Sequence, residues 1–312
     1  MNNLPLYFLG CWLIVLTVGC GTPSPTEDAK AWEHPRAAPA GDKARSTSQS
    51  LADVTQEYEQ EVLQFQQKRQ TASTAGQQEV NSKQIPAASP DPETYAYRLI
   101  DIIQDNRGDL ANLDGIQWIL KKVDDGPTRR TAIELIQTDY IETEPIADVL
   151  PILVDGYPDQ ISMQIIKRLA ETSNHTRVRA VAKMSHIKGY QAIIRFVHFL
   201  DNPKWTDRMK SFVDDSTLKF YREAAEQTFN LEEKLQELDP ASIYGGYHYG
   251  SKIKGRPVQK IGQMASDMLF SLQHLQVGKS APNIEAEDLD GIIFSLEEYR
   301  GKIVMLDFWG DW

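Results

Sequence analysis

The sequence predicts a mainly α fold, and two observations support this prediction. From residue 91 to residue 238, apolar side chains recur three or four positions apart, which places them on one face of successive helices. Glycine and proline interrupt this pattern at short intervals, so the helices should be short and joined by tight links. We therefore expect residues 91–275 to form an antiparallel helical array.

Composition excludes several classes of function. The chain holds 44 acidic and 33 basic side chains, a net charge of -11, so it repels phosphate backbones and we expect no nucleic-acid partner. Its two cysteines, Cys11 and Cys20, lie near the start, which excludes a disulfide framework or a cysteine zinc site from the rest of the chain. The histidines form no HExxH motif or close pair, so we expect no zinc site from them. We also expect no other metal site and no cofactor.

Residues 1–20 resemble a signal peptide. The stretch from Leu4 to Gly19 is apolar and uncharged, but it is shorter than the ~20 residues that a membrane-spanning helix needs. Its end, Leu16-Thr17-Val18-Gly19-Cys20, resembles the lipobox of bacterial lipoproteins. We therefore expect Cys20 to be a lipid-attachment site with membrane lipid as its partner, and the body to lie outside the cytoplasm, anchored to the cell membrane.

Two alternatives to this lipoprotein interpretation stay open. Thr17 stands where the lipobox usually has leucine, and no lysine or arginine precedes the apolar run. A cleaved signal of a secreted protein or an uncleaved membrane anchor also fits the segment, and either one places the body outside the cytoplasm.

Residues 21–90 are expected to form a disordered tether, because small and polar residues dominate and large apolar side chains are scarce. One short amphipathic helix interrupts this tether, with Ser50 as its expected N-cap. We expect it to dock on the helical body or to fray. A coiled coil is the less favoured alternative, because the apolar run covers only about two heptads. The apolar face of this helix consists of Leu51, Val54, Tyr58, Val62 and Phe65.

The helical array begins at Asp91-Pro92-Glu93, which supplies a capping carboxylate, a proline at the first helical position and an acid near the positive end of the helix dipole. Gly189 is expected to separate two of the later helices. The further helices are expected at Leu113–Val123, Thr128–Thr138, Pro145–Val154, Gln160–Ala170, Val178–His186, Ala192–Leu200 and Ser216–Leu238.

The helical array shows no catalytic motif. The adjacent pairs Asp124-Asp125 and Asp214-Asp215 lack the alternating acids and central glycine of a calcium loop. The glycine- and tyrosine-rich stretch Tyr244–Pro257 lacks the GK[ST] sequence of a phosphate loop, so we expect it to pack the array against the next segment. Trp118 and Trp205 are expected to fill the core or an interface.

From His274 onward, several motifs follow one another in a fixed order. They are Val277-Gly278-Lys279-Ser280-Ala281-Pro282, Asp288-Leu289-Asp290-Gly291, Phe294-Ser295-Leu296, Tyr299-Arg300-Gly301-Lys302 and the segment Ile303–Trp312. Their order and spacing resemble the opening of a thioredoxin-like redoxin domain of the TlpA and AhpC/TSA group. The resemblance implies a hairpin turn at the Asp-Gly pair, a short helical turn closed by glycine, and a central strand at the end.

The resemblance implies a thiol–disulfide oxidoreductase or antioxidant with a protein thiol or disulfide as partner. In that family a Cys-Gly-Pro-Cys sequence follows the central strand, and its first cysteine attacks a disulfide that the second cysteine resolves. This sequence stops at Trp312, before that position, so no catalytic residue can be carried over. We expect residues 276–312 to be a truncated thioredoxin-like domain that is inactive as written.

Other interpretations of the same segment stay open. A nonsense mutation, a frameshift, a sequencing error or a UGA codon that encodes selenocysteine would each end the sequence at this position, and the codon after Trp312 distinguishes them. The alternative function is a non-enzymatic helical interaction module tethered at a membrane.

Overall fold

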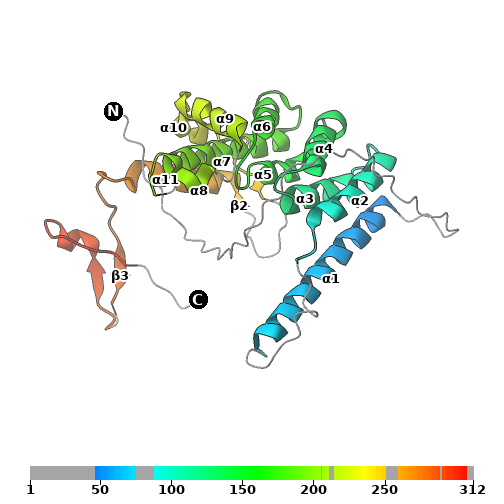
Figure 1. The fold of residues 1–312 in the computed structure, drawn as a ribbon. Coiled ribbons are helices and arrows are strands. Elements are labelled where there is room, and N and C mark those ends of the chain that lie inside the picture. The colour runs from blue at the N-terminus through cyan, green and yellow to red at the C-terminus, as the bar shows by residue number, and fades with distance from the viewer. Residues whose placement is uncertain are drawn as a thin grey trace. The chain divides into compact units, whose positions relative to one another are not determined.

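The computed structural model describes residues 46–74, 88–204, 206–210, 214–250, 259–288 and 290–307. The prediction of a mainly α chain is confirmed: helices make up most of the described residues, and the strands are short (Figure 1). The described residues fall into two units that divide between Ala265 and Ser266. We call residues 46–265 the helical unit and residues 266–307 the C-terminal unit.

The helical unit contains, in chain order, α1 (Thr47–Thr74), α2 (Pro92–Asp105), α3 (Asn112–Lys122), α4 (Pro127–Leu135), the π-helix η1 (Ile136–Tyr140), the 3-10 helix η2 (Glu144–Asp148), α5 (Leu150–Leu153), α6 (Gln160–Thr172), α7 (Thr176–Leu200), α8 (Thr206–Lys210), α9 (Asp215–Glu226), α10 (Leu231–Gln236), β1 (His248–Tyr249) and β2 (Gln259–Lys260). Strands β1 and β2 pair antiparallel. Helix α11 (Ile261–His274) begins in this unit. The C-terminal unit contains the rest of α11, β3 (Glu285–Glu287), β4 (Ile293–Ser295) and the 3-10 helix η3 (Leu296–Tyr299).

Helix α1 is longer than the sequence predicts, and Ser50 is not its N-cap. The helix starts at Thr47 behind a reciprocal capping pair, in which Ser46 Oγ accepts from the Gln49 backbone N–H at 3.3 Å and Gln49 Oε1 accepts from the Ser46 N–H at 3.4 Å. Ser50 therefore lies in the first turn, where its own N–H bonds to the Ser46 carbonyl. Of the expected tether, residues 21–90, the structure describes only 46–74, which hold α1, and the short segment 88–90.

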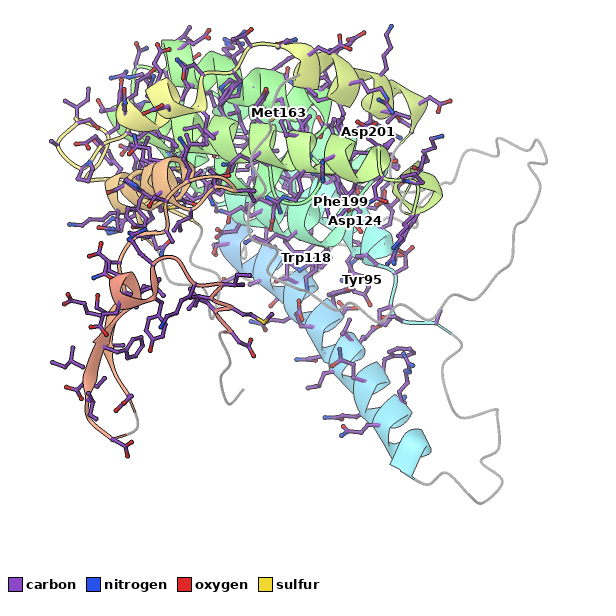
Figure 2. The ribbon with its side chains drawn as sticks, turned by 90° about the vertical axis from the view of Figure 1, so that its left-hand side faces the viewer. Tyr95, Trp118, Asp124, Met163, Phe199 and Asp201 are labelled. Atoms are coloured by element: carbon purple, nitrogen blue, oxygen red, sulfur yellow. The ribbon has the colours of Figure 1, made fainter. Side chains whose placement is uncertain are left out.

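The first half of α1 docks on α2 and α3, as one alternative predicted. Tyr58 is 8% exposed, and its ring lies edge-on to two other rings, 5.2 Å from the centroid of Tyr95 and 5.1 Å from that of Trp118. Figure 2 shows both partner residues beside this helix. The C-terminal half of the helix extends away from α2 and α3 (Figure 1), and Leu63 is 53% exposed. The docked face therefore covers only the N-terminal half of α1.

The predicted start of α2 is confirmed. Asp91 Oδ1 accepts a hydrogen bond of 3.0 Å from the Glu93 N–H, and Pro92 occupies the first helical turn. The Glu93 carboxylate then reaches the start of α4, where Oε2 accepts from Thr128 Oγ1 at 2.9 Å and Oε1 accepts from the Thr128 N–H at 3.3 Å. One acidic side chain thus joins the N-terminal ends of two helices, where the helix dipoles favour negative charge.

A glycine makes this bridge between α2 and α4 possible. Gly126 has a φ of +149°, and a Cβ atom built on it would lie 2.9 Å from Glu93 Oε2. A larger residue at position 126 would therefore be strained in its backbone and would push the carboxylate away from Thr128.

Buried Asn112 connects α2, α3 and η1. Its Nδ2 donates to the Asn106 carbonyl at 2.7 Å and to Tyr140 Oη at 2.9 Å, and Asn112 is fully buried. Arg129 on α4 similarly donates to the Leu120 carbonyl at 2.7 Å, which satisfies a carbonyl at the C-terminal end of α3. These side chains supply the polar partners that the ends of short packed helices lack.

The prediction that Gly189 separates two helices is wrong, because α7 runs without interruption from Thr176 to Leu200. Glycine costs about 1 kcal/mol relative to alanine inside a helix. Here its missing side chain makes room for α6 and for the end of α5: a Cβ atom at position 189 would lie 2.5 Å from Met163 Sδ and 3.0 Å from Val154 Cγ1. Close packing against α7 compensates for the low helix propensity of glycine.

The single helix expected over Ser216–Leu238 is also wrong. The structure has two helices, α9 and α10, with Gln227–Asn230 between them. Asn230 caps the second helix, since its Oδ1 accepts from the Glu233 N–H at 3.2 Å. This break places Phe229 against α7, where it stacks on Tyr190 with a centroid distance of 4.0 Å.

Replacement of Tyr58 by alanine tests the docking of α1. The Y58A variant is expected to lose about 3 kcal/mol of unfolding free energy, because it leaves Tyr95 and Trp118 without their central ring. Urea denaturation followed by circular dichroism measures this loss. The matched control is Leu63→Ala on the exposed half of the same helix, with an expected change below about 0.5 kcal/mol. Equal effects of the two substitutions would contradict the docked arrangement.

Candidate functional site

The C-terminal unit contains the expected hairpin. Strands β3 and β4 pair antiparallel, with Ala286 opposite Phe294. Gly291 in the turn has a φ of +77°, a conformation that glycine adopts without strain. Asp288 Oδ1 accepts from the backbone N–H groups of Asp290 and Ile292, each at 2.9 Å. The turn is therefore specified by local residues, and the prediction at the Asp-Gly pair is confirmed.

The expected helical turn after the hairpin is also present as η3, and Gly301 beyond it has a φ of +87°. Asn283 joins this turn to the hairpin, because its Oδ1 accepts from Ser295 Oγ at 2.9 Å and from the Glu297 N–H at 3.0 Å. The C-terminal unit thus holds its hairpin and helical turn together through one amide side chain.

The expected central strand is not formed in the residues that the structure describes. Residues 303–307 have no regular secondary structure, and Met305 is 92% exposed. A strand needs hydrogen-bonding partners on a neighbouring strand, and none lies beside 303–307 among the described residues. The apolar composition of this segment is therefore not sufficient to form the strand.

The one predicted site residue, Cys20, lies outside the described residues. Within them, no helix is both long and apolar enough for a membrane crossing. The part of the chain that the structure describes also contains no group of three histidine, cysteine, aspartate or glutamate side chains arranged to hold a metal ion.

The helical unit contains a pocket of about 460 Å³ that the sequence did not indicate. Helix α7 supplies one side, α6 another, and the link between α9 and α10 a third. Phe229 forms an aromatic wall with Tyr190, whose ring is stacked on it at an interplanar angle of 17°, and with His186, whose ring meets it edge-on at 5.3 Å. The hydroxyl of Tyr190 donates to the Gln227 carbonyl at 3.3 Å, which ties the link to α7.

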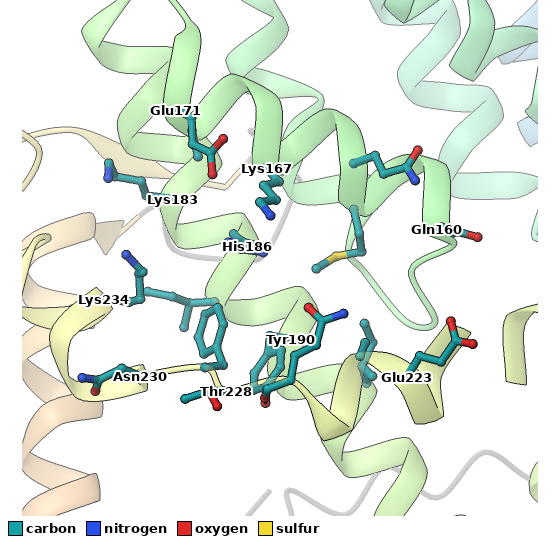
Figure 3. A pocket seen from close by; sticks show the side chains of 18 of the residues that line it. Gln160, Lys167, Glu171, Lys183, His186, Tyr190, Glu223, Thr228, Asn230 and Lys234 are labelled. Carbon is teal, nitrogen blue, oxygen red and sulfur yellow. The ribbon is translucent and has the colours of Figure 1, made fainter. Parts of the chain in front are cut away.

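Charged side chains gather at one end of this pocket. Glu237 accepts there from both Lys183 and Lys234, and its bond to Lys234 is 2.8 Å long. Desolvation opposes this arrangement, but the two ammonium groups together hold the pKa of Glu237 below its ordinary value. Figure 3 shows the labelled charged and titratable residues of this end, Glu171, Lys167, Lys183, His186 and Lys234.

His186 is held as a neutral imidazole more strongly than a histidine in water. Its pKa is lowered mainly by burial and next by the positive charge of Lys167, while Glu171 opposes this shift. The pocket thus combines a neutral ring with cations and an aromatic wall. The sequence alone does not indicate this pocket, because Phe229 is distant in sequence from α7. The recurrence of His186 and Tyr190 four positions apart on one helix face was the available signal.

Comparison with known proteins finds a short region of similarity. Over 40 residues, the chain is 42% identical to the thiol-disulfide oxidoreductase ResA of Bacillus thuringiensis subsp. konkukian (strain 97-27). It is 45% identical over 40 residues to ResA of Bacillus anthracis. Each match covers 13% of this chain and 23% of the relative, so the chain spans less than a quarter of the curated relatives that it matches. This similarity supports a thioredoxin-like relationship for the matched stretch.

The other two comparisons find nothing. No family model matches the chain, and no solved structure matches it. The helical unit therefore has to be interpreted from its own geometry.

The lowered pKa of His186 predicts a dependence of stability on pH. The unfolded chain binds a proton near the ordinary pKa of 6.5, while the folded chain binds it only at lower pH. Between the folded and the unfolded pKa the unfolded state therefore holds more protons at this residue. The stability that neutral His186 contributes is present above about pH 6.5 and is lost as the pH falls toward the folded pKa. Denaturation between about pH 7.5 and about pH 5 should show a smaller loss for His186→Gln than for the wild-type chain.

The control for this measurement is His248→Gln, since His248 is exposed. This variant should retain the full wild-type loss of stability in acid. An identical pH profile for His186→Gln and the wild-type chain would show that His186 does not titrate differently in the folded state.

Proposed function

We propose that the C-terminal part of the chain is the opening of a thioredoxin-like redoxin domain, and that the protein has a role in thiol–disulfide exchange outside the cytoplasm. The observation that carries this proposal is the similarity to ResA, whose name describes a thiol-disulfide oxidoreductase. The matched length of 40 residues agrees with the ordered motifs that follow His274. The hairpin and the helical turn of the C-terminal unit support the same assignment.

The chemistry of such exchange needs two cysteines in the thioredoxin-like domain, and residues 276–312 contain none. The thiolate of the first cysteine attacks one sulfur of the substrate disulfide, so that a mixed disulfide forms and the other substrate sulfur leaves as a thiolate. The thiolate of the second cysteine then attacks the first cysteine's sulfur and releases the remaining substrate thiolate. The 312 residues hold no cysteine after Cys20. The family's exchange reaction therefore cannot take place within these residues alone. We propose a thiol or disulfide of another protein as the partner in this exchange.

We also propose that Cys20 carries a lipid that anchors the protein at a membrane. The support is the apolar segment before it and the small residue Gly19 directly in front of the cysteine. A single acyl chain binds membranes weakly, so stable anchoring requires a second lipid chain or another membrane-binding signal.

A tethered binding module is the second candidate function, and the pocket of the helical unit favours it. Its volume of about 460 Å³ lies in the range typical of small-molecule sites, and its walls combine aromatic rings with a few charged groups. This function uses the helical unit, whereas the thiol–disulfide role concerns the C-terminal unit, so one protein can combine both.

Metabolic labelling with a fatty-acid probe tests the anchor. The wild-type chain should incorporate the label and sediment with membranes, because a lipidated cysteine partitions into the bilayer. Cys20→Ser should lose the label and leave the membrane fraction, while Cys11→Ser, the matched control, should behave as the wild type. An unlabelled wild-type protein, or a Cys20→Ser variant that fractionates unchanged, would refute lipid attachment at this residue.

Insulin reduction tests the thioredoxin-like assignment. A protein of these 312 residues should show no more activity than a variant without Cys11 and Cys20, because no other thiol is present. A chimaera that continues after Trp312 with the remaining residues of Bacillus anthracis ResA should gain reductase activity. The control is the same chimaera with residues 277–312 in scrambled order. Equal activity of the two chimaeras would mean that the segment does not complete a thioredoxin-like domain.

A further inference from the structure

The pocket of the helical unit has an apolar side and a charged end. Tyr190 and Phe229 form a stacked pair along one wall, and Met163 on α6 lines the pocket as well. Phe229 is only partly buried although its ring is large and apolar. A flat aromatic ligand would bury this remaining surface and meet the rings in the offset or edge-on arrangements that aromatic groups prefer.

The charged end has more cations than anions. Lys167, Lys183 and Lys234 face two carboxylates there, Glu171 and Glu237. Glu237 is occupied by two of the lysines. Among the described residues, no carboxylate forms an ion pair with Lys167. The three lysines and two carboxylates therefore leave this end with a net charge of +1.

The opposite end of the pocket has a different character. Gln160 and Glu223 lie there, well separated from Lys167 and His186 (Figure 3). Glu223 makes a long ion pair of 3.8 Å with Lys219 on its own helix. This end therefore offers no excess positive charge, and an anionic group is favoured only at the lysine end.

The one excess positive charge at the lysine end favours an anion with a single negative charge. A phosphate ester carries close to two negative charges, which one excess positive charge does not balance, and bidentate phosphate sites use arginine forks or the backbone N–H groups of a glycine-rich loop. The residues lining this pocket include no arginine and no glycine. A monoanionic carboxylate matches the net charge of this end, and beside Lys167 it can be approached by the neutral ring of His186.

We propose that this pocket binds a small aromatic carboxylate, with its ring against Tyr190 and Phe229 and its carboxylate at Lys167. The proposal names the ligand class for the binding-module function and is independent of the thioredoxin-like relationship. The same chemistry is available from a free aromatic acid or from the C-terminal residue of a peptide that ends in phenylalanine.

Isothermal titration calorimetry of the full chain tests the proposal with 3-phenylpropionate and its uncharged analogue 3-phenylpropanamide. The acid should bind saturably, and the amide should bind about 3- to 10-fold more weakly, because Lys167 is exposed and solvent screens its charge. Lys167→Gln should reduce the affinity for the acid to that for the amide. Lys210→Gln, an exposed lysine on α8 that does not line the pocket, should bind as the wild type.

Phe229→Leu keeps an apolar side chain at the wall and should weaken both compounds, and circular dichroism checks that the variant is folded. Absence of saturable binding by the acid, or unchanged binding in Phe229→Leu, would overturn the proposal. Equal affinities for acid and amide would overturn the carboxylate assignment while leaving a binding module in place. The peptide acetyl-Gly-Gly-Phe distinguishes the two sources: tighter binding than 3-phenylpropionate assigns the ligand to a peptide C-terminus, and weaker binding assigns it to a free acid.

Discussion

The packing of α6 on α7 is the interaction on which the helical unit depends. Helix α7 is buried at positions along its whole length, from Val178 to Leu200, and contacts helices that precede and follow it in sequence. Gly189 lets Met163 approach to a distance that any side chain would prevent. Because protein interiors are close-packed, this contact fixes how α6 lies on α7 and thereby sets two sides of the pocket.

The sequence predicts local features well where one residue determines a boundary. Asp91 and Pro92 start α2 as expected, because the cap and the fixed φ of proline act within one turn. Gly189 is a helix breaker by propensity alone, but its role depends on Met163, which lies on another helix. The pocket was missed for the same reason, since Phe229 meets Tyr190 only after the chain has folded. Tertiary contacts override local propensity at these positions.

The C-terminal unit shows the same division between local and distant determinants. The turn at Asp288 and Gly291 forms from neighbouring residues, so its sequence is a sufficient signal. The segment from Ile303 has the composition of a buried strand, but a strand is completed by hydrogen bonds to another part of a sheet. The composition therefore predicts that this segment favours a strand, but it does not determine whether the strand forms.

The bridge between Glu93 and Thr128 couples two positions that are far apart in sequence. The carboxylate of Glu93 occupies the space that any side chain at position 126 would need. A glycine at 126 is therefore expected wherever an acid at 93 keeps the bridge, and a change at 93 alone would not relieve the backbone strain of a larger residue at 126. Related chains that keep this junction of α2 with α4 should therefore carry both the acid at 93 and the glycine at 126.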